Sequence, residues 1–153
     1  MSTPAVFFLS DAHLGISRTG DEARRGHLVD FLSDIQGEAE ALFVVGDLFD
    51  FWIEYGSFVR GEFLEVLCAL ARLRRRGVRI HYVAGNHDFA LNSFLPRHLG
   101  VEIHRGGFDG EVQGRRVHVE HGDGMLRGET GYRLLRAVLR NRVNQWLYKL
   151  LPP

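Results

Sequence analysis

The stretch that decides the fold is ALFVVGDLFD, residues 41–50, in which an apolar run ends in a glycine and an aspartate. An unbroken apolar run of this length is typical of a strand buried on both faces of a parallel sheet. The same pattern occurs before it, where Ala5–Ser10 precedes Asp11, and after it, where Val78–Ala84 precedes Gly85. We therefore predict three buried strands, at residues 5–10, 41–45 and 78–84.

The segments between these strands have the apolar spacing of amphipathic helices, at residues 21–36 and 58–76. Asp21 is placed to cap the start of the first helix, and Gly37 and Gly77 are placed to end the two helices. Strands that alternate with helices predict an α/β fold with a parallel sheet and right-handed crossovers. Ligands of such sheets bind at the carboxyl ends of the strands.

The pattern changes after residue 100. Short strands are predicted at residues 101–104, 108–112 and 115–120, and the Gln113-Gly114 turn suggests a meander or hairpin on the sheet edge. Residues 131–151 have apolar side chains on one side and basic ones on the other, which predicts a strongly amphipathic helix. Such a helix favours either contact with an anionic membrane surface or packing onto the rest of the domain.

Length and composition exclude several classes of protein. The chain has 153 residues, 45% of them hydrophobic, which is enough for one domain with a core. No run approaches the ~20 apolar residues that cross a bilayer. The one cysteine, Cys68, cannot form an internal disulfide, and the first residues lack the pattern of a secretion signal. We therefore expect a cytoplasmic protein in a reducing compartment.

The charges of the chain balance, with nineteen basic and nineteen acidic residues. This balance argues against a nucleic-acid partner, because a general nucleic-acid binder must neutralise phosphates over its surface. One arginine cluster, Arg72 to Arg79, lies at the end of the second predicted helix. We expect it to complement the helix dipole, with phosphate binding as the alternative.

Polar motifs follow the predicted strands. If Asp11 and His13 lie on an extended segment, side-chain alternation points them the same way, so both can reach one cation. Asp47 has two carboxylate oxygens and is able to bridge two ions. Carboxylate, amide and imidazole donors without thiolate suit manganese, iron or zinc. Two such ions ~3.5 to 4 Å apart would stabilise the attacking and leaving oxygens of an in-line displacement at phosphorus. The motifs are Asp11-Ala12-His13, Gly46-Asp47, Gly85-Asn86-His87-Asp88 and His121-Gly122-Asp123.

Each motif also has a purely structural interpretation. A single aspartate or histidine after a strand is usually a turn former or a helix cap. The whole set, however, would gather six titratable or amide side chains at one sheet edge with no cation to neutralise them. The other histidines have no glycine turn beside them and are interpreted as surface or core-edge residues; they are His27, His81, His98, His104 and His118.

Together the motifs resemble the sequence blocks of the calcineurin-like metallophosphoesterases, in the same order and with similar spacing. A closer resemblance, to the UDP-2,3-diacylglucosamine hydrolases of lipid A synthesis, is carried by FLSDAHLG at 8–15, GDLFDFW at 46–52, and the stretch from His121 through Gly131-Tyr132-Arg133 to Asn141. The resemblance implies an α/β/β/α sandwich. It also implies hydrolysis of the pyrophosphate bond of an acylated sugar nucleotide, UDP-2,3-diacylglucosamine, by a metal-activated water at the inner face of the cytoplasmic membrane.

The same resemblance implies a metal-binding role for five residues. Asp11 and His13 would bind one divalent ion, Asn86 and His121 would bind the second, and Asp47 would bridge the two. The expected metal is manganese. The products would be UMP and 2,3-diacylglucosamine 1-phosphate.

Catalytic and substrate-binding roles are implied as well. His87 would stabilise the phosphoryl group or protonate the departing oxygen, and Asp88 would orient a ligand or a catalytic histidine. The residues expected at the substrate are Asn86, His87, Glu129, Tyr132 and Arg133. Four aromatic residues near the motifs would either form an acyl-binding wall or cover the sheet; they are Phe49, Phe51, Trp52 and Phe89.

The chain departs from this family pattern at three places. The hydrolase branch has arginine where this chain has His87, which is the general phosphoesterase residue, and tends to have aspartate where this chain has Glu129. The late Gly-His-x-His motif, which supplies one histidine to each metal, is not in the sequence. We therefore expect residues 1–153 to be a single domain, incomplete at its C-terminus, that is the N-terminal portion of a longer enzyme or a truncated product. Alone it should bind metal weakly and turn over slowly.

Three functions stay open on this basis. The first is hydrolysis of the acylated sugar nucleotide. The second is another phosphodiesterase or phosphatase activity on the same fold, and the third is a non-catalytic scaffold. The oligomeric state is not indicated by the sequence.

Overall fold

The computed structural model describes most of the chain up to residue 123. The described residues are 4–15, 20–52, 54, 59–88, 91, 93–123 and 141. The elements in chain order are β1 (Ala5–Leu9), α1 (Asp21–Asp34), η1 (Ile35–Gly37), β2 (Ala39–Val45), η2 (Gly61–Phe63), α2 (Leu64–Arg75), β3 (Arg79–Val83), η3 (Leu95–Leu99), β4 (Glu102–His104), β5 (Phe108–Val112) and β6 (Arg115–Val119).

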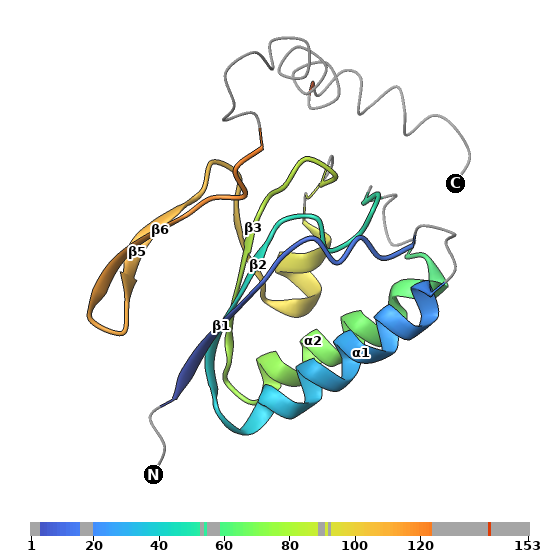
Figure 1. Cartoon of the computed structure of the whole chain (residues 1–153), viewed down its shortest axis with the longest axis horizontal. Helices are drawn as coiled ribbons and strands as arrows, with labels where there is room; N and C mark the ends of the chain where they lie inside the picture. The colour runs from blue at the N-terminus through green and yellow to red at the C-terminus, as the bar shows by residue number, and fades with distance from the viewer. Residues whose placement is uncertain are drawn as a thin grey trace.

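Four strands form one parallel sheet in the order β1-β2-β3-β4. The helices α1 and α2 lie along one side of this sheet, and the β5–β6 hairpin lies on the other (Figure 1). The predicted α/β fold with a parallel sheet is therefore confirmed. Helices, sheet and hairpin correspond to three layers of the predicted α/β/β/α sandwich.

The main core lies between the sheet and the two helices. Because strand side chains alternate, Leu42 and Val44 of β2 point to the helical side, where they are buried in one cluster with Val66 and Leu70 of α2. Phe43 points to the other side and meets Phe108 of β5, with the ring centroids 5.0 Å apart. The hairpin therefore packs against the face of the sheet that the helices leave open.

Strand β1 differs from its prediction. It was expected to be buried on both faces, but it is an edge strand of the sheet and most of its residues are half-buried. Phe8 is 51% exposed and stacks on Phe43 of the neighbouring strand. The prediction was wrong because an apolar run does not reveal whether a strand is central or at an edge, which the tertiary topology decides.

The start of α1 also differs from the prediction that Asp21 caps it. The cap position is Gly20, whose φ is 95°, and Asp21 is the first helical residue. The Asp21 carboxylate accepts a hydrogen bond from the Gly15 N–H at 3.3 Å. Asp21 therefore ties the loop after β1 to the helix, and its negative charge still lies favourably at the helix N-terminus.

The residues after 100 form two structures rather than one meander. The hairpin prediction is confirmed, since β5 and β6 pair antiparallel around Gln113-Gly114, both with positive φ. The strand predicted at residues 101–104 is also confirmed, as β4, but it is not part of a meander, because it pairs parallel with β3 and extends the main sheet. The connection from β3 to β4 contains η3 and is long enough for the crossover that parallel pairing requires.

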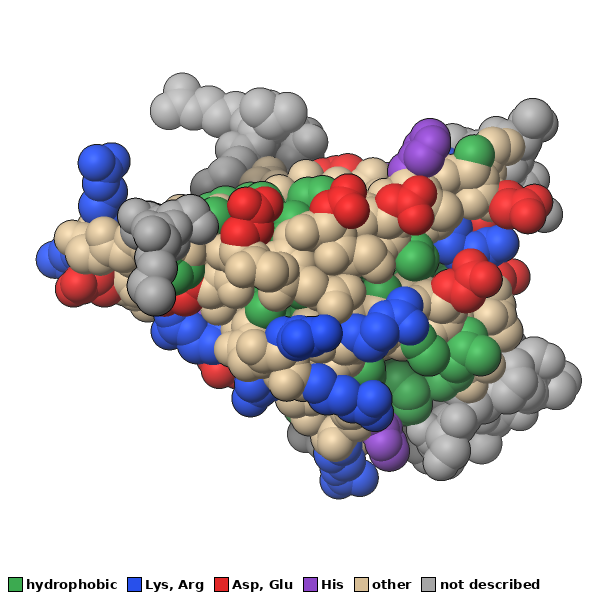
Figure 2. Space-filling view, turned by 90° about the horizontal axis from the view of Figure 1, so that it is seen from below, with side chains coloured by type: hydrophobic (Ala, Val, Ile, Leu, Met, Phe, Trp, Pro, Cys, Tyr) green, Lys and Arg blue, Asp and Glu red, His purple; other side chains and the backbone are tan. Residues whose placement is uncertain are grey.

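The helix α2 begins at residue 64, later than predicted. Arginines occupy its last turn. Arg72, Arg74 and Arg75 are exposed there, and their charges complement the helix dipole. Figure 2, a view from below, shows several basic side chains gathered in the lower half of this face and acidic ones in its upper half. Arg74 also donates from Nε to the Gly100 carbonyl oxygen at 3.3 Å. These contacts support the interpretation of the cluster as a helix end.

The predicted C-terminal helix, residues 131–151, lies outside the described residues. So does the last layer of the predicted sandwich. Within the part of the chain that the structure describes, no helix combines the length and the apolar character needed to cross a membrane.

We expect Leu70→Ala to lower the free energy of unfolding by about 2–5 kcal/mol, because the side chain is 2% exposed in the core. Leu64→Ala on the same helix is the matched control. Leu64 is 57% exposed, so its truncation should change stability by less than about 0.5 kcal/mol. Urea denaturation followed by circular dichroism measures both. Equal losses would contradict the placement of Leu70 in the core.

Candidate metal centre

The backbone pairing of β1 with β2 continues past the ends of both strands. The Asp11 N–H donates to the Gly46 carbonyl oxygen at 3.2 Å, and the His13 N–H donates to the Asp47 carbonyl oxygen at 2.9 Å. Leu14 continues the pairing with Leu48 at 3.0 Å. This ladder places the first polar motif directly beside the second.

The local backbone at these motifs is left-handed, not extended. Asp11, His13 and Asp47 have φ values of 54°, 44° and 54°. Among the described residues the only other non-glycine residue with positive φ is Gln113, in the hairpin turn. The strand-alternation reasoning for Asp11 and His13 was therefore wrong, although their side chains do meet. Non-glycine residues held in this conformation store strain and cluster at functional sites.

Two glycines allow the loops to come this close. A Cβ at Gly46, whose φ is 76°, would collide with the His121 ring and with the Gly85 Cα. A Cβ at Gly85 would collide with the Asp47 carboxylate. Both positions therefore need glycine for the motifs to converge.

Asp88 ties the loops after β2 and β3 together. Its Oδ2 accepts hydrogen bonds from the N–H groups of Asp47 and Gly85, at 3.0 and 2.9 Å, and its Oδ1 accepts one from the Tyr82 hydroxyl at 2.7 Å. Asp88 is 2% exposed. Burial raises the pKa of Asp88, while these hydrogen bonds oppose the rise. Asp88 contacts the backbone N–H of Asp47, so this is the contact through which the orienting role expected for Asp88 would act.

The Asp47 carboxylate lies at the centre of the converging motifs. Its Oδ2 is 3.8 Å from His13 Nε2 and 3.4 Å from His121 Nε2, and its Oδ1 accepts the His87 N–H at 2.9 Å. The side chain is 2% exposed. Burial alone would raise the pKa of Asp47, but the hydrogen bonds from His121 and from the His87 backbone lower it below its ordinary value. Asp47 is therefore a buried carboxylate that stays charged.

His121 is oriented by the backbone of β2. Its Nδ1 lies 2.8 Å from the Val45 carbonyl oxygen, and its Nε2 lies 3.1 Å from Asn86 Oδ1. The hydrogen bond with Asp47 raises the pKa of His121 to about 9, although burial opposes it. A carbonyl that holds one ring nitrogen and leaves the other aimed at carboxylate and amide oxygens is the usual arrangement of a metal-binding histidine.

Asp50 was missed by sequence reasoning. Its Oδ1 lies 3.5 Å from His13 Nδ1 and 3.4 Å from His87 Nδ1, and its backbone carbonyl also accepts from His87 Nδ1. One residue therefore contacts both imidazoles, whose rings are 4.8 Å apart. Its only sequence signal was its position in the GDLFDFW stretch, three residues after Asp47.

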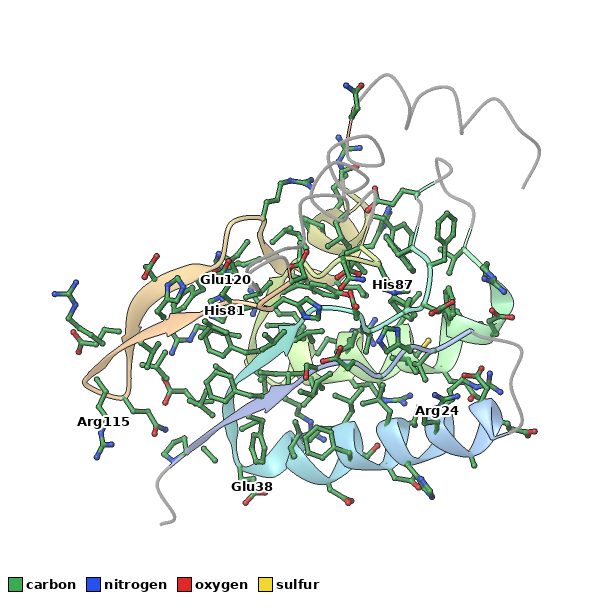
Figure 3. All side chains as sticks on the ribbon, turned by 45° about the horizontal axis from the view of Figure 1, so that its top comes forward. Arg24, Glu38, His81, His87, Arg115 and Glu120 are labelled. Carbon is green, nitrogen blue, oxygen red and sulfur yellow. The ribbon has the colours of Figure 1, made fainter. Side chains whose placement is uncertain are left out.

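The donor set fits divalent cations. One ligand atom from each of His13, Asp47 and His87 lies within 4.8 Å of the other two, and the same holds for Asp11, Asp47 and His121. Asp47 belongs to both groups. Ligand atoms that bind one ion at about 2.0–2.2 Å lie roughly 3 to 3.6 Å apart, close to the separations of 3.1 to 3.8 Å found between neighbouring donors. Figure 3 shows His87 in this region.

The family profile of the calcineurin-like phosphoesterases matches residues 4–151. The chain belongs to this family. Membership of this metallophosphoesterase family implies divalent metal ions, in agreement with the oxygen and imidazole donors that the motifs bring together.

Several curated relatives of this calcineurin-like phosphoesterase carry the name UDP-2,3-diacylglucosamine hydrolase. The proteins of Porphyromonas gingivalis, Nitrosococcus oceani and Aeromonas hydrophila are 35%, 33% and 33% identical to it over 97% of the chain. The matched parts make up 57%, 58% and 60% of those relatives. The chain thus spans less than two thirds of their length.

Solved structures support the calcineurin-like phosphoesterase fold. Nuclease MPE of Pseudomonas putida matches with a TM-score of 0.50 and 16% identity, over 68% of this chain and 49% of the nuclease. A protein of unknown function from Aquifex aeolicus matches with a TM-score of 0.50 and 19% identity, over 87% of this chain and 70% of that protein. At these identities the likeness shows the fold alone.

The predicted site residues divide into two sets in this phosphoesterase. The five predicted metal ligands and His87 lie together, and Asp88 lies beneath them. The predicted substrate residues Glu129, Tyr132 and Arg133 lie outside the described residues, as does Phe89. Phe49 and Trp52 are buried and stack on each other, so they cover the core instead of lining an acyl site.

We expect Asp88→Asn to lower the free energy of unfolding by about 1–3 kcal/mol. The asparagine NH₂ replaces an acceptor, so at least one of the three buried donors around position 88 loses its partner. Asp34→Asn, at the exposed end of α1, should change stability by less than about 0.5 kcal/mol. Guanidinium denaturation compares the two. A wild-type midpoint for Asp88→Asn would exclude the tethering role.

We expect Asp50→Asn to weaken manganese binding by about 10- to 100-fold, because the neutral amide removes a charged carboxylate that lies 3.5 Å from His13 Nδ1 and 3.4 Å from His87 Nδ1. Calorimetric titration with MnCl₂ measures the change in Kd. Asp30→Asn, on the exposed side of α1, serves as the charge-matched control. If both variants bind manganese as wild type does, Asp50 has no orienting role.

Proposed function

We propose that this chain carries the metal site of a hydrolase that cleaves the pyrophosphate bond of UDP-2,3-diacylglucosamine to UMP and 2,3-diacylglucosamine 1-phosphate. The name shared by the curated relatives supports this substrate. The observation that carries the reaction type is the buried Asp47 carboxylate, which belongs to both groups of metal-competent side chains. A carboxylate shared in this way suits a pair of divalent cations.

Five residues would bind the metal ions in the arrangement that the resemblance to the family implies. Asp11 and His13 would hold one cation, Asn86 and His121 would hold the second, and Asp47 would be a ligand of both. Two divalent cations, for which we propose manganese, would supply an activated water and offset charge on the phosphoryl oxygens. Because Asp47 is buried while Asp11 is 55% exposed, the ligand set opens toward solvent on the side of Asp11, where a phosphate group has access.

Two residues beside the metal ligands have different roles: His87 acts on the substrate, and Asp88 positions a metal ligand. His87 is 34% exposed, and its Nδ1 is bonded to the Asp50 carbonyl, so Nε2 is the nitrogen that delivers a proton to the departing oxygen. Asp88 has no direct part in this step. It positions Asp47 through the backbone N–H that it accepts.

The acylated substrate places the reaction at a membrane surface. Each buried CH₂ group contributes about 0.8 kcal/mol to membrane binding, so two acyl chains hold such a sugar nucleotide in the bilayer. We therefore include in the proposal contact with the inner face of the cytoplasmic membrane, and substrate binding by Glu129, Tyr132 and Arg133. The greater length of the curated relatives supports a domain that works as part of a longer enzyme.

A second candidate is another phosphodiesterase activity of the same family. The observation that favours it is His87, which lies in one ligand group with His13 and Asp47 at a position where the hydrolase branch has arginine. A histidine there is the general pattern of the phosphoesterases, which favours a phosphodiester other than the acylated sugar nucleotide. Comparison of UMP release from the acylated sugar nucleotide with cleavage of bis-p-nitrophenyl phosphate separates the two candidates.

We expect Asp47→Ala to lower manganese-dependent UMP release by more than about 100-fold in the full-length product of the gene, because loss of a shared ligand should exceed the 10- to 100-fold effect of outer ligand partners. Its thermal unfolding should stay cooperative, since the tether to Asp88 uses the backbone N–H of residue 47.

Asp34→Ala, far from the motifs on α1, should keep wild-type turnover and is the matched control. Turnover of Asp47→Ala at the wild-type rate would refute the shared ligand. Equal rates with manganese and with excess chelator would refute the metal-dependent reaction itself.

A further inference from the structure

Three residues outside the Asp47 centre form a third group of metal-competent side chains, separate from the two that contain Asp47. His81 lies on β3, and Glu102 and His104 lie on β4. The strands pair in parallel register with His81 opposite Glu102, and His104 follows two residues later on the same face. The sequence had suggested ordinary surface or core-edge roles for both histidines.

This group lies on the sheet face that carries the hairpin. His81 stacks on Phe43 with centroids 4.5 Å apart, and Phe108 of β5 lies 5.3 Å from His81 and 5.1 Å from His104. Figure 3 shows His81 beside the hairpin and apart from His87. The group shares no residue with the two groups that contain Asp47.

The ligand atoms converge on one point. His81 Nδ1 lies 3.1 Å from His104 Nε2 and 3.3 Å from Glu102 Oε2, and the three atoms all lie within 4.8 Å of one another. Two ligands of a tetrahedral ion with bonds of about 2.0–2.1 Å are roughly 3.3 Å apart. The two separations at His81 Nδ1 therefore match the edges of one coordination polyhedron.

A hydrogen bond between the histidines does not account for all three groups. One proton on His81 Nδ1 makes a good hydrogen bond with only one of its two neighbours, His104 Nε2 at 3.1 Å or Glu102 Oε2 at 3.3 Å. A cation at their common centre satisfies all three lone pairs. Burial lowers the pKa of His81, whose side chain is 8% exposed, so its imidazole is in the neutral form that binds metals.

The donors select the class of metal. Two imidazoles and one carboxylate without sulfur suit zinc and its neighbours among the divalent transition metals. Glu102 is 62% exposed, so the site opens to solvent at the carboxylate, where a water would complete the coordination of a bound ion. Phe43 and Phe108 cover the opposite side and keep it apolar.

We propose that His81, Glu102 and His104 bind one zinc-type divalent ion that cross-links β3 to the edge strand β4. The position gives the ion a structural role. β4 has three residues and pairs with β3, and the carbonyl of His104 accepts the Ala84 N–H at 2.9 Å, directly before the Gly85–Asp88 motif. The ion therefore fixes the edge strand beside the loop that enters the Asp47 centre.

The test is zinc binding by the metal-free full chain, measured by calorimetry and by metal analysis after gel filtration. We expect His104→Gln and Glu102→Gln to bind one zinc fewer per chain than wild type. The zinc-induced rise in Tm should shrink in both. His27→Gln, an exposed histidine on α1, is the matched control and should keep the wild-type stoichiometry.

An Asp47→Asn background separates this site from the first centre. In that background the remaining zinc should disappear when His104→Gln is added, and cobalt should give a d–d spectrum that the double variant lacks. Since His104 and Glu102 are not fully buried, these variants should fold, which circular dichroism checks. Unchanged stoichiometry, Tm shift and cobalt spectrum in a folded His104→Gln protein would overturn the proposal.

Discussion

The arrangement of the site depends on one buried carboxylate, that of Asp88. It accepts the N–H groups of Asp47 and Gly85 and the hydroxyl of Tyr82, which come from two loops and a strand. A buried carboxylate is costly unless its oxygens are hydrogen-bonded. The loops after β2 and β3 are therefore stable only in the relative position that supplies these donors, and that position brings Asn86 and the Asp47 side chain to the same place.

The sheet and the convergence of the motifs could be predicted because both follow from simple periodicity and topology. Apolar runs that end in polar residues mark buried strands, and parallel strands have their carboxyl ends at one edge. Each of three residues that are far apart in the sequence follows a strand; they are Asp11, Asp47 and His121. Their convergence could therefore be predicted without knowledge of their detailed contacts. The resemblance of the motifs to a known family then indicated the type of reaction, metal-dependent hydrolysis at phosphorus.

The contacts that hold the site could not be predicted in this way. Asp50 lies in a loop, where the sequence has no helix or strand periodicity to distinguish one carboxylate from another. Its contacts with His13 and His87 depend on how the loop folds, which the sequence pattern does not show. The left-handed backbone at Asp11 likewise follows from pairing with the Gly46 segment, not from the residue type. For the same reason the apolar run of β1 did not reveal an edge strand.

Strain and tethering together explain how the candidate ligands are held. Each residue in an unfavourable backbone region costs on the order of 1–3 kcal/mol, and Asp11, His13 and Asp47 all adopt the left-handed conformation. The continued β1–β2 ladder and the Asp88 hydrogen bonds offset this cost with protein contacts alone. The first centre is therefore pre-organised by the fold. The cluster at His81 lies instead beside a three-residue edge strand, where a bound ion would itself supply a cross-link. Metal binding would therefore stabilise the fold at the His81 cluster, whereas at the first centre the fold arranges the ligands before a metal binds.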